Sequence, residues 1–338
     1  MQTKMKTVAI IGATGAVGSQ IIQLLENRNF PNEKIRFFAS EKSFGKKILF
    51  RRQEIPIEIL SNETLSQIDL AFFAAGSSLS KKWIPEALKS NILCIDSSSA
   101  YRSDPKIPLI IPEINGHILR SSDRLIASPN CAATILLLPL SPLHQKYAAQ
   151  RIILSTYQAA SGGGAQLYNL LLEETRSFLN QIPFTTHLPY SYAFNLFPHT
   201  SSMQSSGYVD EEMKILEESQ KILQDPNLKI SATCIRVPVL RAHSLSVNVE
   251  FKNPFQLDEV VSTLKQAPGI KIFEDWEKNR FPTPRDVEHK NEVFCGRIRQ
   301  DLSRSNCLEF WAVGDQLLKG AALNAVQIAE LLTTQNLN

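Results

Sequence analysis

The sequence predicts an α/β fold with two domains, a doubly wound parallel sheet followed by an α+β domain with a mostly antiparallel sheet. Three features of the sequence lead to this prediction. Short apolar runs alternate with helical patterns over the first third of the chain, which is typical of parallel sheets covered by helices. A glycine-rich turn follows the first apolar run, and strand patterns dominate the middle of the chain.

The length and composition are those of a globular protein. At 338 residues the chain is long enough for two domains, since a domain averages about 150 residues. The hydrophobic share of 43 % supplies apolar side chains for two cores. The net charge of +3 is too small to predict nucleic acid or an anionic membrane as a partner, and no apolar stretch is long enough for a signal peptide or a membrane span.

The cysteines also constrain the class of protein. The chain has five, which are scattered and show no C-x-x-C spacing, so we expect neither a disulfide framework nor a metal site. This usage favours a reducing compartment, and we expect the cytoplasm.

The hydrophobic patterns place the elements of the first domain. Strands are expected at 7–11, 35–38, 69–74 and 92–95, with helices at 17–25 and 81–89. The runs are short and apolar throughout, as buried parallel strands are.

The second domain shows longer strand patterns. Strands are expected at 151–160, 231–237, 244–251, 293–299 and 307–313, helices at 167–179 and 210–223, and an irregular excursion at 183–208. A last helix at 316–332 has no strand after it, so we expect it to pack on the first domain. The expected domains are therefore 1–130 with 316–338, and 131–315.

The glycine-rich turn lies between the first strand and the first helix. Gly12, Gly15 and Gly18 permit a tight turn there, and the helix start offers backbone N–H groups and a favourable dipole to an anion. The spacing G-x-x-G-x-x-G differs from the usual dinucleotide motif, but a strand before it and a helix after it distinguish it from an ordinary turn. We therefore predict a Rossmann-type dinucleotide-binding domain. The residues expected to face the pyrophosphate are Gly12, Thr14, Gly15, Ala16 and Val17.

The end of the second strand bears on the choice of dinucleotide. Glu41 can accept a hydrogen bond from the ribose 2′-OH of NAD, whereas Ser40, Lys42 and Ser43 can hold the 2′-phosphate of NADP. These residues by themselves leave both cofactors open.

Cys131 stands where a reactive thiol is expected. It follows Pro129 and Asn130 and opens an apolar helix, whose N-terminus stabilises a thiolate. The other four cysteines lie in strand-like runs and fit a buried, structural role. A nucleophilic thiol is usually paired with histidine, and the residues alone do not separate His243 from His187 or His199.

Taken together, these motifs resemble the aspartate-β-semialdehyde dehydrogenase family over nearly the whole chain. The resemblance is carried by the segments 12–18, 97–102, 129–131, 155–162, 210–214, 231–243 and 319–327. It implies a homodimer that uses NADPH to reduce the acyl phosphate of aspartate to the semialdehyde, with release of phosphate, in the biosynthesis of aspartate-family amino acids.

The same resemblance implies roles for individual residues. Cys131 would be the nucleophile and His243 the acid/base catalyst, with Gln158 positioning the acyl intermediate. Arg102 and Lys214 would hold phosphate, and Glu211 and Arg236 would hold the amine and carboxylate of the substrate. The residues implied at the cofactor beyond the turn are Ser40, Lys42, Ser43, Gly76, Ser161, Gly162 and Asn324. Glu41-Lys42 replaces the Ala-Arg pair common in relatives, which bears on the preference for NADP.

Two other functions compete with this one. N-acetyl-γ-glutamyl-phosphate reductase shares the chemistry and the layout, but its substrate has no free amine, so Glu211 favours the aspartyl substrate. A non-catalytic dinucleotide-sensing module would have no reason to keep Cys131, Gln158, Arg236 and His243 together.

Overall fold

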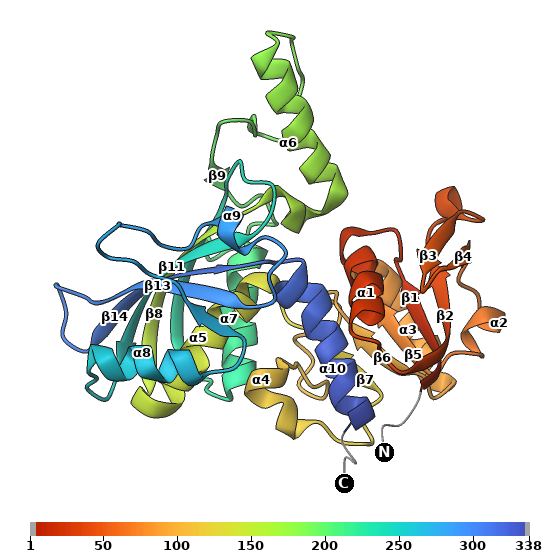
Figure 1. Cartoon of the computed structure of the whole chain (residues 1–338), viewed down its shortest axis with the longest axis horizontal. Coiled ribbons are helices and arrows are strands. Elements are labelled where there is room, and N and C mark those ends of the chain that lie inside the picture. Colours follow the sequence, from red (N-terminus) through yellow and green to blue (C-terminus); the bar gives the residue numbers. More distant parts are fainter. Residues whose placement is uncertain (1–4, 335–338) are drawn as a thin grey trace. The chain divides into compact units, whose positions relative to one another are not determined.

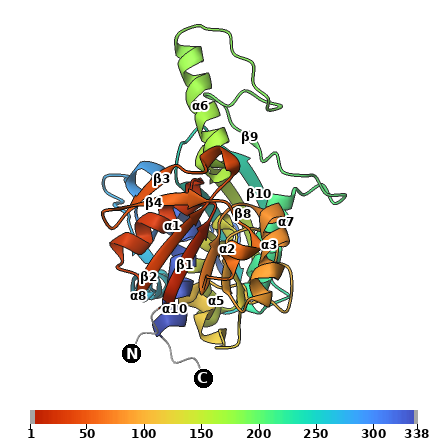
Figure 2. The same cartoon turned by 90° about the vertical axis from the view of Figure 1, so that its right-hand side faces the viewer.

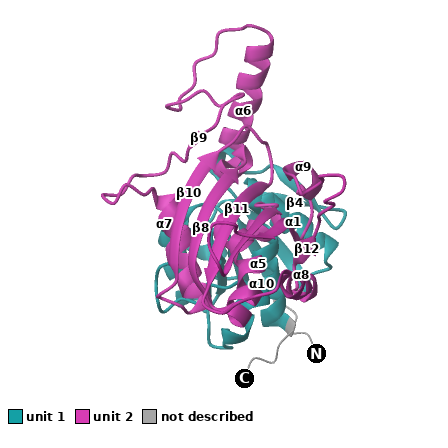
Figure 3. Cartoon of the chain, turned by 90° about the vertical axis from the view of Figure 1, so that its left-hand side faces the viewer, with its two compact units in different colours: residues 1–130, 321–338 teal, residues 131–320 magenta. Residues whose placement is uncertain are grey.

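The computed structural model describes residues 5–334, which fold into two compact units. Unit 1 comprises 1–130 and 321–338, and unit 2 comprises 131–320 (Figure 3). The chain thus returns to unit 1 at residue 321, where the sequence pattern placed the boundary at 316. No helix among the described residues is long and apolar enough to cross a bilayer.

Unit 1 contains a sheet of seven strands within the described residues. Their order is β3 (Lys47–Phe50), β4 (Gln53–Glu58), β2 (Asn32–Phe38), β1 (Met5–Ile11), β5 (Leu70–Phe73), β6 (Leu93–Asp96) and β7 (Leu125–Ala127). All neighbours are parallel except β3 and β4, which form a hairpin. The sequence pattern missed this hairpin because only Phe50 and Ile57 are fully buried in its two strands, so neither strand shows the continuous buried run of a central strand.

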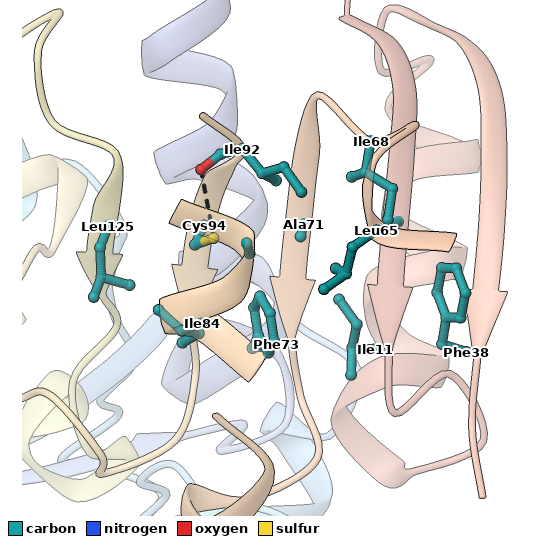
Figure 4. Close-up of a cluster of buried hydrophobic side chains, with 12 residues drawn as sticks. Ile11, Phe38, Leu65, Ile68, Ala71, Phe73, Ile84, Ile92, Cys94 and Leu125 are labelled. Atoms are coloured by element: carbon teal, nitrogen blue, oxygen red, sulfur yellow. Dashed lines mark hydrogen bonds between the residues drawn. The ribbon is translucent and has the colours of Figure 1, made fainter. Parts of the chain in front are cut away.

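Helices connect the parallel strands of unit 1. The connecting helices are α1 (Ala16–Asn27), α2 (Asn62–Leu65), α3 (Ser77–Lys89) and α4 (Pro112–Asn115), and the last helix of the chain, α10 (Leu323–Thr334), belongs to the same unit. The last helix contacts α1, α4 and β6. A buried cluster joins the strands to α3, with Ile11, Ala71, Phe73 and Cys94 on the strands and Ile84 on the helix (Figure 4). Each large apolar side chain buried in this way contributes roughly 1.5–3 kcal/mol.

The sheet of unit 2 is mixed. Its strand order is β12 (Ile270–Ile272), β13 (Val293–Gln300), β14 (Cys307–Gly314), β11 (His243–Phe251), β8 (Ala149–Gln158), β10 (Lys229–Arg236) and β9 (Phe197–Pro198). Two of the pairings of these described strands are parallel, β8 with β10 and β12 with β13, and the other four are antiparallel. The predicted fold class, including a mostly antiparallel second sheet, is confirmed.

One face of this sheet carries the helices. Helix α5 (Cys131–Tyr147) packs on β8, β11, β13 and β14, beside α7 (Asp210–Leu223) and α8 (Leu257–Gln266). The amphipathic pattern gave the limits of α7 because its buried side chains recur at helical spacing. A short helix, α9 (Pro284–Val287), follows α8 and β12.

The prediction of a helix at 316–332 is wrong about where the helix begins. The segment η4 (Leu318–Ala322) is a π-helical turn, and α10 begins only at Leu323. Gly320 lies in this turn, where an added Cβ would come within 2.8 Å of the Cβ of Cys131. The wide turn therefore brings glycine backbone against the start of α5, which is a tertiary contact that periodicity does not encode.

Helix α6 (Gly164–Leu179) projects from the rest of unit 2, and the chain returns from its tip as an irregular excursion (Figures 1 and 2). The buried carboxylate of Glu174 anchors the returning chain, since its Oε2 accepts hydrogen bonds from the backbone N–H groups of Tyr192 and Ala193. Large apolar side chains exposed on this arm are Phe178, Leu179, Ile182, Phe184, Tyr190, Phe194 and Leu196.

Candidate active site

Three strands of unit 2 bring candidate residues to one edge of the sheet. The parallel strands β8 and β10 end at Gln158 and Arg236, which are partners in the register. Strand β11 runs antiparallel to β8 and begins at His243, directly before the pair that Ser244 forms with Tyr157. The C-terminal ends of β8 and β10 and the N-terminal end of β11 thus lie side by side.

The imidazole of His243 is fully buried, and its hydrogen bonding defines its proton position. Its Nδ1 accepts a hydrogen bond from the backbone N–H of Ala159 at 3.0 Å. The neutral ring must then carry its proton on Nε2, which has no hydrogen-bond partner within residues 5–334. Burial, reinforced by the positive charge of Arg236, lowers the pKa of His243 from 6.5 to about 3. At neutral pH the residue is therefore an uncharged donor.

Arg236 is held from two sides. Its Nη1 donates to the carbonyl oxygen of Ala159 at 3.1 Å, and its Nη2 lies 2.7 Å from Nε2 of His199. Arg236 as a whole residue is only 7 % exposed. Burial and the charge of Arg236 lower the pKa of His199 to about 4, so this ring is neutral as well. The sequence offered His199 only as one of three histidines, because its contact with Arg236 depends on the fold.

Glu211 lies in the first turn of α7, close to two other predicted residues. Its Oε2 is 3.5 Å from Nζ of Lys214, one turn along the helix, and its Oε1 is 3.4 Å from Nε2 of Gln158. These contacts are long, but they bring the carboxylate of Glu211, the ammonium of Lys214 and the amide of Gln158 together, and Gln158 is the register partner of Arg236. Gln158, Glu211, Lys214, Arg236 and His243 thus gather at one place in unit 2.

Cys131 differs from the other cysteines in its exposure. It is the first residue of α5 and is partly exposed, whereas Cys94, Cys234, Cys295 and Cys307 are buried. Burial raises the pKa of both Cys94 and Cys234 to about 12, which keeps them as unreactive thiols. Cys131 is therefore the thiol best placed to react.

The turn after β8 lies against the buried histidine. In η3 (Ala160–Gly163), a Cβ on Gly162 would meet Cε1 of His243 at 2.8 Å and Nη1 of Arg236 at 3.3 Å. Ser161 is buried, and its hydroxyl donates to the carbonyl of Leu240 at 2.6 Å. Glycine at 162 thus leaves room for the side chains of His243 and Arg236.

A cavity of about 280 Å³ adjoins Arg236. Arg236, His199 and Ser201 line it together with apolar side chains, among them Leu167 and Phe197. A buried cation in a partly apolar cavity suits a small anionic ligand, because its charge is only weakly screened there.

The glycine turn of unit 1 has the geometry of a nucleotide-binding turn. Gly12 has a φ of +92°, and a Cβ there would lie 2.6 Å from the carbonyl oxygen of Ala74. At Gly18 a Cβ would lie 2.1 Å from the carbonyl oxygen of Gly12, so only glycine fits. No side chain caps α1 at Gly15, which leaves the first N–H groups of this helix for an anion. Thr14, Ala16 and Val17 complete the helix start, and Thr14 is exposed.

The other predicted residues of unit 1 differ in their surroundings. Ser40, Lys42 and Ser43 form a short turn after β2, in which Ser40 and Lys42 are exposed. Gly76 begins α3 with a φ of +86°.

Arg102 and Asn324 are tied to the backbone of unit 1. Arg102 donates to the carbonyl oxygens of Ser128 and Ser97. Asn324 is fully buried, and its Nδ2 donates to the carbonyl oxygen of Ile110 and to Oγ of Ser128. Both amide hydrogens of Asn324 are thus engaged within unit 1.

Comparisons with known proteins agree with this arrangement. The NAD binding domain of semialdehyde dehydrogenases matches residues 7–122, and the dimerisation domain of the same enzymes matches residues 140–319. The aspartate-semialdehyde dehydrogenase of Prochlorococcus marinus is 46 % identical, over 98 % of this chain and 96 % of that protein. The chain belongs to the aspartate-semialdehyde dehydrogenase family. The family member of Bacillus subtilis is 39 % identical over 98 % of both chains.

Solved structures of the family share the fold. The crystal structure of aspartate semialdehyde dehydrogenase II from Vibrio cholerae has a TM-score of 0.94 and 37 % identity, covering 99 % of this chain and all of that one. A second structure of the Vibrio cholerae protein, with the same similarity, is a complex with ASA. Membership of the family gives unit 1 a nicotinamide dinucleotide as its ligand, consistent with its glycine turn.

Proposed function

We propose that this protein reduces L-aspartyl-4-phosphate to L-aspartate-4-semialdehyde, with NADP as cofactor and a thioester on Cys131 as intermediate. The observation that carries the proposal is the group formed by Gln158, Glu211, Arg236 and His243 in the unit that also presents the exposed thiol. The names of the relatives and the ASA complex of the Vibrio cholerae enzyme support an aspartyl substrate over an acetylglutamyl one.

The chemistry follows from the residue types. The sulfur of Cys131 attacks the acyl carbon, the bond to phosphate breaks, and the net proton lost by the thiol leaves on hydrogen phosphate. A thioester accepts hydride readily, unlike a carboxylate, and bound NADPH supplies that hydride. The tetrahedral product then collapses, which re-forms the C=O bond and expels the thiolate. The first turn of α5 stabilises this thiolate at both stages.

His243 serves this sequence as a hydrogen-bond donor. Each tetrahedral species carries a negative oxygen, and a donor aimed at that oxygen lowers the barrier. The lone pair of Nδ1 is engaged by Ala159, so the neutral ring offers the proton on Nε2. In the proposal His243 therefore acts on the acid side of the acid/base role that the family resemblance implies.

The charged residues select the substrate. A guanidinium binds a carboxylate through two parallel hydrogen bonds, so Arg236 takes the α-carboxylate. Glu211 takes the amine, Lys214 and Arg102 take phosphate, and Gln158 positions the acyl group. These assignments rest on charge complementarity, on the grouping in unit 2, and, for Arg102, on the resemblance to the family.

The cofactor choice and its contacts are part of the proposal. The helix start at Gly12, Thr14, Gly15, Ala16 and Val17 takes the pyrophosphate, and Ser40, Lys42 and Ser43 take the 2′-phosphate. Exposure of Ser40 and Lys42 leaves them accessible to such a group. The contacts of Gly76, Ser161, Gly162 and Asn324 with the nucleotide rest on family resemblance.

Two further aspects of the protein follow from the same family. The expected catalytic and dimerisation domain at 131–315 forms a homodimer, consistent with the exposed apolar side chains of the α6 arm and with Ile153, which is 42 % exposed on the sheet. All five cysteines are thiols, which fits the cytoplasm. Sedimentation equilibrium tests the dimer, because a monomer at micromolar concentration would contradict it.

The reaction is tested in reverse, by following formation of reduced nicotinamide with aspartate semialdehyde. Turnover should need inorganic phosphate, and NADP⁺ should be preferred to NAD⁺. Turnover with N-acetylglutamate semialdehyde in place of aspartate semialdehyde would establish the competing function. Equal rates with NADP⁺ and NAD⁺ would contradict the proposal that Ser40, Lys42 and Ser43 bind the 2′-phosphate.

A further inference from the structure

We infer that His199 is a positioning residue that aims the guanidinium of Arg236 at the carboxylate of the substrate. The inference rests on the proposed function, since it assumes that Arg236 binds a carboxylate. It concerns a residue outside the motifs that carry the family resemblance, on the segment that returns from the α6 arm.

The hydrogen bond between Arg236 and His199 fixes the tautomer of the ring. A guanidinium only donates, so Nε2 of His199, 2.7 Å from Nη2, must accept. The proton of the neutral ring then lies on Nδ1, which donates to Oγ of Ser201 at 3.1 Å. The backbone nitrogen of Ser201 is also 3.2 Å from Nδ1. A neutral imidazole has only one acceptor nitrogen, and in His199 this is Nε2, so Nδ1 cannot also accept a hydrogen bond from that backbone N–H.

The hydroxyl of Ser201 extends this chain to the other substrate-binding group. Its oxygen also accepts a hydrogen bond from the backbone N–H of Glu211 at 3.1 Å, in the first turn of α7. One network therefore links the start of α7 to Arg236 through Ser201 and His199. Glu211, proposed to bind the amine, and Arg236, proposed to bind the carboxylate, are thus connected through the same hydrogen bonds.

The backbone around His199 is itself fixed by the sheet. Phe197 in β9 pairs with Arg236 in β10, and the N–H of His199 donates to the carbonyl of Cys234 at 2.8 Å. His199 directly follows β9, so its side chain approaches that of Arg236 from the segment beside β10. With Nη1 held by Ala159 and Nη2 held by His199, the guanidinium plane has little freedom to turn.

Loss of the second tether should cost substrate binding. An arginine with one remaining bond can rotate, and must be ordered again when the carboxylate binds. A hydrogen bond to a charged group typically accounts for a factor of about ten or more in affinity. The effect should be confined to the ligand that carries the carboxylate.

The test compares His199→Leu with His199→Gln in the reverse assay. The leucine variant should raise KM for aspartate semialdehyde about tenfold and leave KM for phosphate and for NADP⁺ within twofold. Glutamine should restore most of the affinity, because its amide oxygen can accept from Nη2. His117→Leu, at an exposed histidine of unit 1, is the matched control and should behave as the wild type.

The outcomes separate the inference from the proposed function. A folded His199→Leu protein with unchanged KM for the aldehyde overturns the inference, as does an equal rise of all three KM values. A wild-type protein without phosphate-dependent turnover overturns the proposed function instead. Calorimetric binding of L-aspartate then decides the inference, which fails if wild type and His199→Leu bind it equally or not at all.

Discussion

The backbone N–H of Ala159 donates a hydrogen bond to Nδ1 of His243 over 3.0 Å. The two residues are 84 positions apart in the chain; Ala159 directly follows β8, and His243 begins β11. This bond occupies the lone pair of Nδ1, so the neutral ring carries its proton on Nε2.

His243 should be a neutral Nε2–H tautomer at pH 7. Nitrogen-15 spectroscopy of the histidine rings measures this, with His243→Ala used to assign the signal. The same variant should lower kcat about 10²- to 10³-fold, as loss of an oxyanion donor does, with little change in KM. A ring protonated on Nδ1 would contradict the assignment.

The free energy of unfolding should decrease as the pH is lowered below 6.5, the ordinary pKa of histidine. Burial lowers the pKa of His243 from 6.5 to about 3 and that of His199 from 6.5 to about 4. Between these values and 6.5 the unfolded chain binds more protons, so the free energy of unfolding decreases as the pH falls through this window. Each residue should remove about 2 kcal/mol between pH 7 and pH 5. Urea unfolding at the two pH values measures the loss, which His199→Gln should reduce; an unchanged loss would argue against a depressed pKa.

Cys131→Ser should fold normally and lose nearly all turnover, because a hydroxyl does not replace the thiolate as nucleophile. Alkylation with iodoacetamide should modify a single fast-reacting thiol in the native wild-type chain and none in the variant. This is expected because Cys131 is partly exposed, whereas the other four cysteines are buried. Near-normal activity of the serine protein would refute the thioester mechanism.

Gly162→Ala should lower kcat/KM at least about tenfold, since a Cβ at 2.8 Å from Cε1 of His243 must displace a fully buried ring. Gly116→Ala is a suitable control, because its Cβ would meet only the end of the Leu331 side chain in unit 1. Steady-state kinetics of the two proteins compare the effects. Equal activities would show that the ring tolerates the shift.

Arg236→Lys should raise KM for aspartate semialdehyde while kcat changes less. An ammonium is a point charge and cannot reproduce the two parallel hydrogen bonds of a guanidinium. It also cannot keep the contacts with Ala159 and His199 at once. The measurement is KM for each substrate, and an unchanged value for the aldehyde would count against a carboxylate at this position.

Local features of the sequence were sufficient for much of the fold. The amphipathic spacing at 210–223 reproduces α7, and the glycine turn marks the junction of β1 and α1, because both patterns are properties of neighbouring residues. The hairpin of β3 and β4 and the π-helical turn at 318–322 escaped the patterns. The two strands of the hairpin bury only Phe50 and Ile57, so they lack the continuous buried run of a central strand. The π-helical turn lies where Gly320 leaves no room for a Cβ beside Cys131, and neighbouring residues do not encode that proximity.

The sequence by itself also determined which residue types were available and where a thiol opens a helix. The tertiary structure decided how they act. The contact of His199 with Arg236 spans 37 positions, and that of His243 with Ala159 spans 84. Sequence spacing cannot separate His187, His199 and His243, since proton position and charge depend on burial and on partners that only the register of β8, β9, β10 and β11 brings together.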